Sequence, residues 1–377
     1  MKRRIASHFA LIDGRLERDR IVEVDKRGTI TAIEHCTAID SRAGVEFYPG
    51  ILIPGMVNAH AHLELAYLRG VIAEETGFAG FARAIGQVRG NYTTEERVRA
   101  ARVADAMMWQ EGVQAVADIA NDDLIMELKE QSAIEYHTLF EHFGLRNNDT
   151  APLEALAARY NNATVTPHST YSVAEAPFRT IVERGTTPLS VHFLESDDEH
   201  ALYQHAGSLW TWYERMGWEC DFLHYDTAAK RITACVPPEQ RLMLVHATRA
   251  TATDVATIND HFTTPATWVL CPESNRYISR LEPPVEMLRA VGCAIAIGTD
   301  SLASARHMSM VENMRMLGVV PLEELLSYAT INGARALGID DRIGSIEVGK
   351  RPGLAVIEGV DFEAMRLTDE SRARRIV

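Results

Sequence analysis

Short apolar runs alternate with amphipathic stretches along most of the chain, and this alternation predicts its architecture. Eight runs between residues 51 and 297 have the length and composition of buried strands, and segments with helical periodicity or helix-cap residues lie between them. The expected strands are Ile51–Val57, Ala115–Ile119, Ile134–Phe140, Thr164–Thr166, Leu189–Leu194, Leu242–Val245, Thr267–Leu270 and Ala294–Ile297. The expected helices include Thr94–Glu111, Glu175–Arg184, Thr251–His261 and Pro321–Leu337. Repeated strand–helix units predict an α/β fold, a (β/α)8 TIM-like barrel, with an open doubly wound sheet as the competing arrangement.

Both ends of the chain show β-type patterns instead, with Gly-containing turns between the runs. The expected terminal strands are Ile5–Ile12, Arg20–Val24, Thr29–Glu34, Arg342–Val348 and Leu354–Glu358. We expect the strands from the two ends to join in one small composite β-sandwich domain. The predicted division is therefore residues 1–53 with 338–377 for this domain, and residues 54–337 for the barrel.

The composition narrows the class of protein. Asp and Glu number 52 against 38 Lys and Arg, and the net charge of −14 argues against a nucleic-acid or anionic-membrane partner. No run of 18 apolar residues suggests a membrane span, and charged residues follow the N-terminus too soon for a signal peptide. The five cysteines form no C-x-x-C pair and are typical of reduced thiols. We expect a cytoplasmic protein and consider a homodimer as its oligomeric state.

Polar side chains collect where the expected strands end. In a barrel, the carboxyl ends of the strands form the face that carries active sites. The residues at or just beyond these ends are His60, His62, Asp118, His168, His192, Glu195, His246, Asn275 and Asp300. Five of the 14 histidines of the chain fall in this set, which is more than random placement would give.

Several of these residues have the chemistry of a metal site. Side chains two apart on a strand point the same way, so His60 and His62 face one point, although two hydrogen-bonded histidines remain the alternative. His192 and Asp300 follow the fifth and eighth strands, and the eighth strand neighbours the first in a closed barrel. Three imidazoles and a carboxylate can hold a divalent transition metal. Such a metal lowers the pKa of a bound water towards about 7.

Two further residues could move or hold protons. Glu195 lies three residues after His192, and strict strand alternation points the two side chains to opposite faces. Glu195 can therefore serve the site only if the strand has already turned into its loop, and a solvated acidic loop, Glu195–Glu199, is the alternative. His246 could orient a water, or it could be a hydrogen-bonded core histidine.

These residues stand in a combination of motifs that resembles the amidohydrolase superfamily over nearly the whole chain. The motifs are Pro54-Gly55-Met56-Val57-Asn58-Ala59-His60-Ala61-His62, His192-Phe193-Leu194-Glu195, Leu244-Val245-His246, Cys271-Pro272-Glu273-Ser274-Asn275 and Gly298-Thr299-Asp300-Ser301. The chain looks like the branch of cytosine, guanine, S-adenosylhomocysteine and aminofutalosine deaminases.

The resemblance implies a single divalent metal, zinc or iron, with zinc favoured. It gives the ligands as His60, His62, His192 and Asp300. It also implies that Glu195 is the acid/base group, that His246 positions the water and stabilises developing charge, and that Asp300 accepts a hydrogen bond from that water.

The activity implied is hydrolytic deamination of an aminopurine-type nucleoside or base, a small heteroaromatic molecule, with release of ammonia. Stretches such as Thr166-Pro167-His168-Ser169 resemble aminofutalosine deaminases more narrowly, which suggests an aminodeoxyfutalosine-like substrate. The alternatives are triazine dechlorination, hydrolysis of a cyclic amide or imine, and a non-catalytic metal-binding barrel. The expected substrate contacts, for which capping or core packing is the competing role, are Glu64, Phe78, Phe81, His168 and Asn275.

Overall fold

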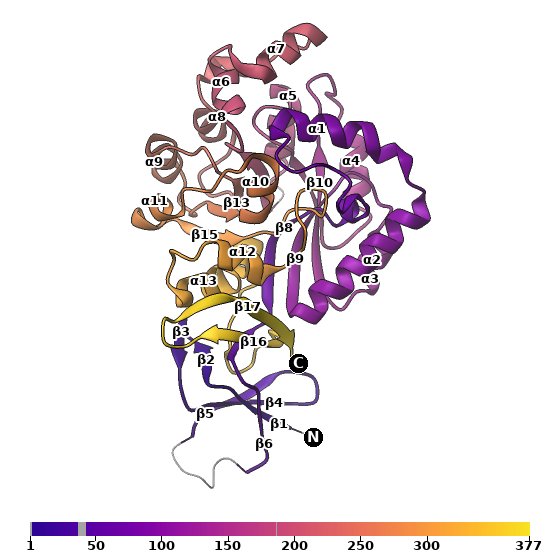
Figure 1. Cartoon of the computed structure of the whole chain (residues 1–377). Coiled ribbons are helices and arrows are strands. Elements are labelled where there is room, and N and C mark those ends of the chain that lie inside the picture. The colour runs from indigo at the N-terminus through magenta and orange to yellow at the C-terminus, as the bar shows by residue number, and fades with distance from the viewer. Residues whose placement is uncertain (1, 37–42, 186) are drawn as a thin grey trace.

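A parallel β-barrel forms the main part of the computed structural model, which describes residues 2–36, 43–185 and 187–377 (Figure 1). Its strands form two four-stranded parallel sheets, in the orders β11-β10-β9-β8 and β12-β13-β14-β15. Their bounds are β8 Met56–Ala61, β9 Val113–Ala120, β10 Glu135–His142, β11 Ala163–Pro167, β12 Leu189–Phe193, β13 Leu242–His246, β14 Thr267–Leu270 and β15 Ala294–Ile297. Isolated bridges from Ala61 to Asp300 and from Ser169 to His192 join the two sheets. The predicted barrel is confirmed, and the open doubly wound sheet is wrong.

Helices follow the barrel strands and surround them (Figure 1). Their bounds are α1 Gly77–Val88, α2 Thr94–Glu111, α3 Met126–Gln131, α4 Ala151–Ala157, α5 Glu175–Glu183, α6 Asp197–Tyr203, α7 Gly207–Met216, α8 Ala228–Cys235, α9 Ala252–His261, α10 Pro272–Ser279, α11 Val285–Ala290, α12 Met310–Met316, α13 Leu322–Tyr328 and α14 Ile331–Leu337. The long predicted helix Pro321–Leu337 is two helices, α13 and α14. A capping box between Thr93 and Glu96 begins α2 as its sequence predicts.

The predicted strand Ile51–Val57 is wrong as a single element, because the chain changes sheets within it. Ile51–Pro54 forms β7, which pairs with β16 (Leu354–Asp361) and β2 (Phe9–Ile12), whereas the first barrel strand, β8, begins at Met56. Gly55 separates them at a crowded point. A Cβ atom there would lie 2.5 Å from the carbonyl oxygen of Pro352 and 2.6 Å from Cβ of Gln114, so a residue without a side chain is required.

Strands from both ends of the chain form two further sheets, at the bottom of Figure 1. Their orders are β5-β4-β1-β6 and β17-β16-β7-β2-β3. Their bounds are β1 Arg3–Ala6, β2 Phe9–Ile12, β3 Arg15–Glu17, β4 Arg20–Val24, β5 Ile30–His35, β6 Val45–Phe47, β16 Leu354–Asp361 and β17 Arg366–Arg375. The domain division predicted above stays a prediction, and its residues 1, 37–42 and 186 lie outside the described residues.

The predicted terminal strands need two corrections. Ile5–Ile12 is divided between β1 and β2. Arg342–Val348 forms turns instead of a strand, and the Lys350 ammonium fixes them by donating to the Asp340 carbonyl at 2.6 Å and to Ser345 Oγ at 2.8 Å. Two apolar residues of that segment, Ile343 and Ile346, are buried as anchors of the loop, whereas Val348 is exposed.

Small and medium apolar side chains fill the barrel below its carboxyl end. Ala59, Ala117, Leu139, Val245 and Ala296, which lie on β8, β9, β10, β13 and β15, belong to one buried cluster. A filled interior confines chemistry to the strand ends and the loops that follow them. Among the described helices, none has both the length and the apolar character that a membrane span needs.

Candidate metal centre and active site

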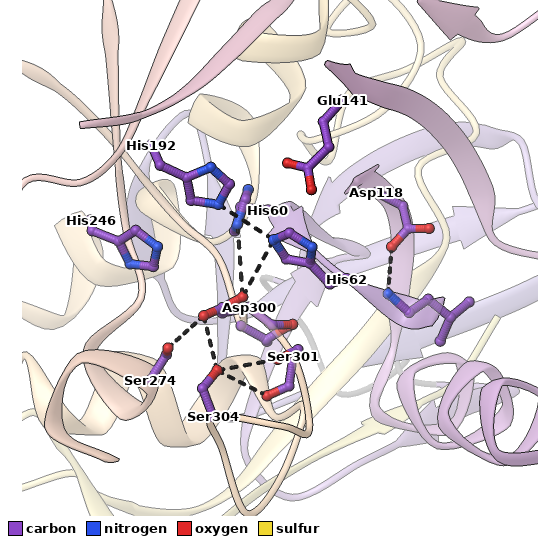
Figure 2. Close-up of polar contacts among 12 residues, drawn as sticks. His60, His62, Asp118, Glu141, His192, His246, Ser274, Asp300, Ser301 and Ser304 are labelled. Atoms are coloured by element: carbon purple, nitrogen blue, oxygen red, sulfur yellow. Dashed lines mark hydrogen bonds and ion pairs between the residues drawn. The ribbon is translucent and has the colours of Figure 1, made fainter. Parts of the chain in front are cut away.

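Three histidines and an aspartate from the first, fifth and eighth barrel strands meet at the carboxyl end (Figure 2). Nε2 of His62 lies 3.4 Å from Nε2 of His192. Oδ1 of Asp300 lies 3.8 Å from Nε2 of His60 and 3.6 Å from Nε2 of His62. All four side chains are at most 10% exposed. The ring nitrogens and the carboxylate oxygen therefore converge on one buried point.

These separations fit a transition-metal ion. Two nitrogen ligands at zinc distance in a tetrahedral site lie about 3.3 Å apart, close to the spacing of the His62 and His192 nitrogens. Neither ring nitrogen of His60 has a hydrogen-bond partner among the described residues, although the ring is fully buried. Burial also lowers the pKa of His60 and of His192 well below the usual histidine value. The rings are thus neutral, which is the form that binds a metal.

Hydrogen bonds orient the donor atoms of two of these residues. Nδ1 of His192 donates to the carbonyl oxygen of His168 at 2.8 Å, which leaves the lone pair of Nε2 directed at the cluster. Oδ2 of Asp300 accepts from Ser274 Oγ at 2.5 Å and from Ser304 Oγ at 2.9 Å. Its other oxygen, Oδ1, is then the one that faces His60 and His62.

The backbone holds His60 against the last barrel strand. The His60 carbonyl accepts hydrogen bonds from the amides of Thr299 and Asp300, both at 3.0 Å. The strands approach so closely that a Cβ on Gly298 would lie 2.8 Å from Cβ of His60. The Asn58 side chain makes two further hydrogen bonds to Thr299. Its Nδ2 donates to Thr299 Oγ1 at 2.7 Å, and its Oδ1 accepts from the Thr299 backbone amide at 3.1 Å. The predicted proximity of the first and eighth strands is therefore confirmed.

Backbone turns in the left-handed region place three of the site residues. Leu194 has φ +48°, His246 has φ +75° and Asp300 has φ +57°. This region is costly for residues other than glycine and is found where surrounding structure imposes it, often at functional sites. The turn at Leu194 follows the end of β12 at Phe193 and directs Glu195 back towards the cluster. The strand has therefore already turned into its loop before Glu195, as the sequence analysis required for Glu195 to serve the site.

Glu195 and His246 lie side by side next to the cluster. Oε1 of Glu195 is 3.8 Å from Nε2 of His246, and its Oε2 accepts a long hydrogen bond, 3.4 Å, from the Tyr171 hydroxyl. Burial raises the pKa of Glu195, while His246 opposes the shift and the charge of Asp300 adds to it. Nδ1 of His246 donates to Oδ1 of Asn275 at 2.8 Å, a tautomer assigned from this contact, so Nε2 faces Glu195.

The loop Glu195–Glu199 is not a uniformly solvated acidic segment. The side chain of Glu195 is 11% exposed and that of Asp197 is 79% exposed. Glu199 is fully buried, and burial raises its pKa to about 8. Its carboxylate accepts hydrogen bonds from the Thr170 hydroxyl and from the Glu195 amide, so it supports the turn that carries Glu195.

The residues expected to contact the substrate differ in their neighbours and in their burial. The His168 ring stacks on the His192 ring at 4.5 Å, and Phe78 meets Tyr171 edge-on at 5.4 Å. Phe81 instead packs in a small apolar cluster around Leu68. Glu64 is 2% exposed, and burial raises its pKa to about 7. Substrate contact by these residues stays a prediction.

The sequence analysis missed Glu141, which lies near the end of β10 beside His192 (Figure 2). The predicted third strand stopped at Phe140, one residue short of Glu141. The available signal was the position itself, because a carboxylate at the carboxyl end of a barrel strand belongs to the active-site face.

A buried ion pair anchors the turn that follows His62. Nζ of Lys129 lies 2.5 Å from Oδ2 of Asp118, and neither side chain is more than 2% exposed. Oδ1 of Asp118 accepts the backbone amide of Leu63 at 2.8 Å. The pair therefore fixes the backbone one residue beyond a predicted metal ligand.

Replacing Lys129 with Met leaves the Asp118 carboxylate buried without its cation. We expect the free energy of unfolding to fall by about 3–5 kcal/mol, as for other broken buried ion pairs. Urea titration followed by circular dichroism measures the change. Lys230→Met, at an exposed ion pair with Asp226, is the matched control and should stay close to wild type. An unchanged midpoint in Lys129→Met would show that the pair does not stabilise the fold.

The chain is similar to several known proteins in sequence and in overall fold. A family model described as "Amidohydrolase family" matches residues 51–372. A 5-methylthioadenosine/S-adenosylhomocysteine deaminase of Haloarcula marismortui is 26% identical over 383 aligned residues, covering 94% of this chain and 82% of the relative. Helicobacter pylori aminofutalosine deaminase, solved with methylthio-coformycin, superposes with a TM-score of 0.83 at 22% identity over the whole of both chains. Atrazine chlorohydrolase of Arthrobacter aurescens, solved with zinc, gives a TM-score of 0.78 at 16% identity, covering 99% and 93%.

Proposed function

The chain belongs to the amidohydrolase family, and we propose that it is a metal-dependent hydrolase that removes the amino group of an aminopurine-type nucleoside or base. The observation that carries this proposal is the buried convergence of His60, His62, His192 and Asp300 with Glu195 and His246 beside them. Relatives named as nucleoside deaminases support the same activity.

The residues present fit one divalent ion, and His60, His62, His192 and Asp300 would hold it. We propose zinc, because imidazole and carboxylate ligands suit it and a related fold has been solved with zinc. When bound, the ion supplies a Lewis-acidic centre that makes water nucleophilic near neutral pH.

Glu195 carries the protons in this proposal. Its carboxylate accepts the proton of the attacking water and gives it to the ring nitrogen beside the carbon that bears the amino group. A second proton from the same water oxygen goes by way of Glu195 to the amino group, which leaves as ammonia. The raised pKa of Glu195 suits both steps, since a group that accepts and returns protons works best with a pKa near the working pH.

His246 and Asp300 orient the reacting water. With its Nδ1 proton held by Asn275, His246 presents Nε2 as a hydrogen-bond acceptor on the same side as Glu195. Asp300 is fixed by Ser274 and Ser304 and turns its remaining oxygen towards the histidines. Such preorganised partners cost no reorganisation at the moment of reaction.

A product assay tests the proposal. Purified protein with metal is incubated with adenosine, 5-methylthioadenosine, S-adenosylhomocysteine, an aminofutalosine-type compound, guanine and cytosine, and ammonia is measured. We expect ammonia from at least one aminopurine nucleoside or base, with an oxo product in equal amount. Release of ammonia from none of the aminopurines would contradict the proposal, and a chlorotriazine and a cyclic amide assayed in parallel would show whether the alternative chemistry occurs instead.

A further inference from the structure

Glu141 has a buried carboxylate oxygen without a partner at the edge of the metal cluster. The residue is 8% exposed. Oε1 accepts a hydrogen bond from the side-chain amide of Asn121 at 2.8 Å, but Oε2 has none among the described residues. An unpaired buried acceptor, and a charged one above all, is unfavourable. Native structures therefore keep such groups rarely and for a reason.

The carboxylate of Glu141 is aimed at the site. Figure 2 shows it facing the rings of His192 and His62. One of its oxygens lies within 4.8 Å of ring nitrogens of both His168 and His192. Glu141 comes from β10, whereas Glu195 and His246 follow or end β12 and β13. The Glu141 carboxylate thus borders the space beside the metal cluster from β10, whereas Glu195 and His246 border it from the ends of β12 and β13.

A second metal ion is a poor explanation for this oxygen. Nδ1 of His192 already donates to a carbonyl, and its Nε2 faces the cluster with His62. Nδ1 of His168 is bonded to Ser172 Oγ at 2.7 Å. The three residues therefore do not present three free donor atoms to a second ion.

Asn121 positions Glu141 but donates a hydrogen bond to only one of its two carboxylate oxygens. The backbone amide of Asn121 donates to Oε2 of Glu64 at 2.9 Å, while its side chain donates to Glu141. Within the described part of the chain, no lysine or arginine forms an ion pair with either carboxylate. The missing donor must then come from outside the protein.

We propose that Glu141 binds a neutral hydrogen-bond donor of the substrate, a hydroxyl of its sugar. It thereby selects nucleosides that carry such a donor against those with an acceptor or an anionic group at that place. This inference rests on the proposed function and adds a specificity-determining residue to it.

Steady-state kinetics of Glu141→Leu and Glu141→Gln test the inference. The substrates are adenosine, which carries all the sugar hydroxyls, and 2′-deoxyadenosine, 3′-deoxyadenosine and adenine, which lack the 2′-hydroxyl, the 3′-hydroxyl and the whole sugar. We expect kcat/KM for the fully recognised substrate to fall about 10- to 100-fold in Glu141→Leu, as for a lost hydrogen bond to a charged group. The loss in Glu141→Gln should be smaller, because its amide oxygen still accepts.

The substrate panel identifies the donor. For a substrate that lacks the recognised hydroxyl, Glu141→Leu and wild type should have equal kcat/KM, since the interaction is already absent. If all four substrates lose equally, the lost donor lies on the base, where the exocyclic amino group is the only N–H that all four share, and recognition of a sugar hydroxyl is overturned. Glu135→Gln, at the start of the same strand and paired with Arg342 on the surface, is the matched control.

Binding of the product inosine, measured by calorimetry, gives a readout that is independent of turnover. We expect a dissociation constant at least tenfold higher in Glu141→Leu at unchanged metal content. Wild-type kinetics and inosine binding in both variants would overturn the inference while leaving the deaminase proposal intact. Loss of one of two bound metal equivalents would also overturn it, in favour of a second metal. A wild type that releases no ammonia from any aminopurine would contradict the proposed function, and the inference would fall with it.

Discussion

Replacing Glu195 with Gln lowers the rate of ammonia release about 10²- to 10⁴-fold and leaves the metal content unchanged. The amide has the size of the carboxylate and keeps an acceptor oxygen, but it cannot take a proton from water and deliver it to the substrate. Glu195 is not one of the residues that converge on the metal position, so its replacement leaves those donor atoms in place.

Parallel measurements of kcat, KM and metal content make this test specific. Asp197→Asn is the matched control, because Asp197 lies two residues away with its side chain 79% exposed and pairs with Arg249 at the surface. We expect the control to keep wild-type kcat. A Glu195→Gln enzyme with kcat within a few-fold of wild type would remove Glu195 from the proton-transfer role.

Replacing His60 with Ala abolishes stoichiometric metal binding and, with it, turnover. His60 is fully buried, both ring nitrogens lack a hydrogen-bond partner among the described residues, and its Nε2 faces Oδ1 of Asp300. Removing the ring takes away one of the donors and opens a polar space in its place. The remaining donors would hold the ion much more weakly.

Elemental analysis of the purified variant measures this effect directly. His224→Ala, at an exposed histidine bonded to the Asp221 carbonyl, is the control and should keep its metal. Thermal unfolding of both variants shows whether the fold survives the substitution. Full metal occupancy in a folded His60→Ala protein would contradict the ligand assignment.

Much of the site could be predicted from the sequence, because the order of the strands in the barrel brings its residues together and the exact packing of side chains matters less. His60, His192 and His246 each end or follow an apolar run, and strand ends meet on one face of a barrel. Closure of the barrel then brings Asp300 to His60 across a long stretch of sequence.

Other features depend on tertiary contacts that no local pattern records. The break between β7 and β8 at Gly55 follows from its contacts with Pro352 and Gln114, which are distant in sequence. The polar strand β17 has only Ser371 buried and lies at the edge of its sheet, so its alternation signal is weak. The left-handed turn at Leu194, which directs Glu195, has no glycine to mark it.

The oligomeric state, the cellular location and the substrate contacts could not be determined from the strand pattern. The homodimer and the cytoplasmic location stay predictions, as do the roles of Glu64, Phe78 and Phe81 in substrate contact. Their sequence signals were composition and position, and neither determines which face meets a partner or which side chain meets a ligand.

Metal-dependent ammonia release is the most direct test of the central claim that this barrel is a metal-dependent deaminase. The protein is stripped with a chelator, assayed with the best aminopurine substrate of the panel, and assayed again after one equivalent of zinc is added. We expect no ammonia from the stripped protein, and restored release with an equal amount of oxo product after zinc. Ammonia release that is unaffected by stripping, or its absence from every aminopurine with zinc bound, would contradict the claim.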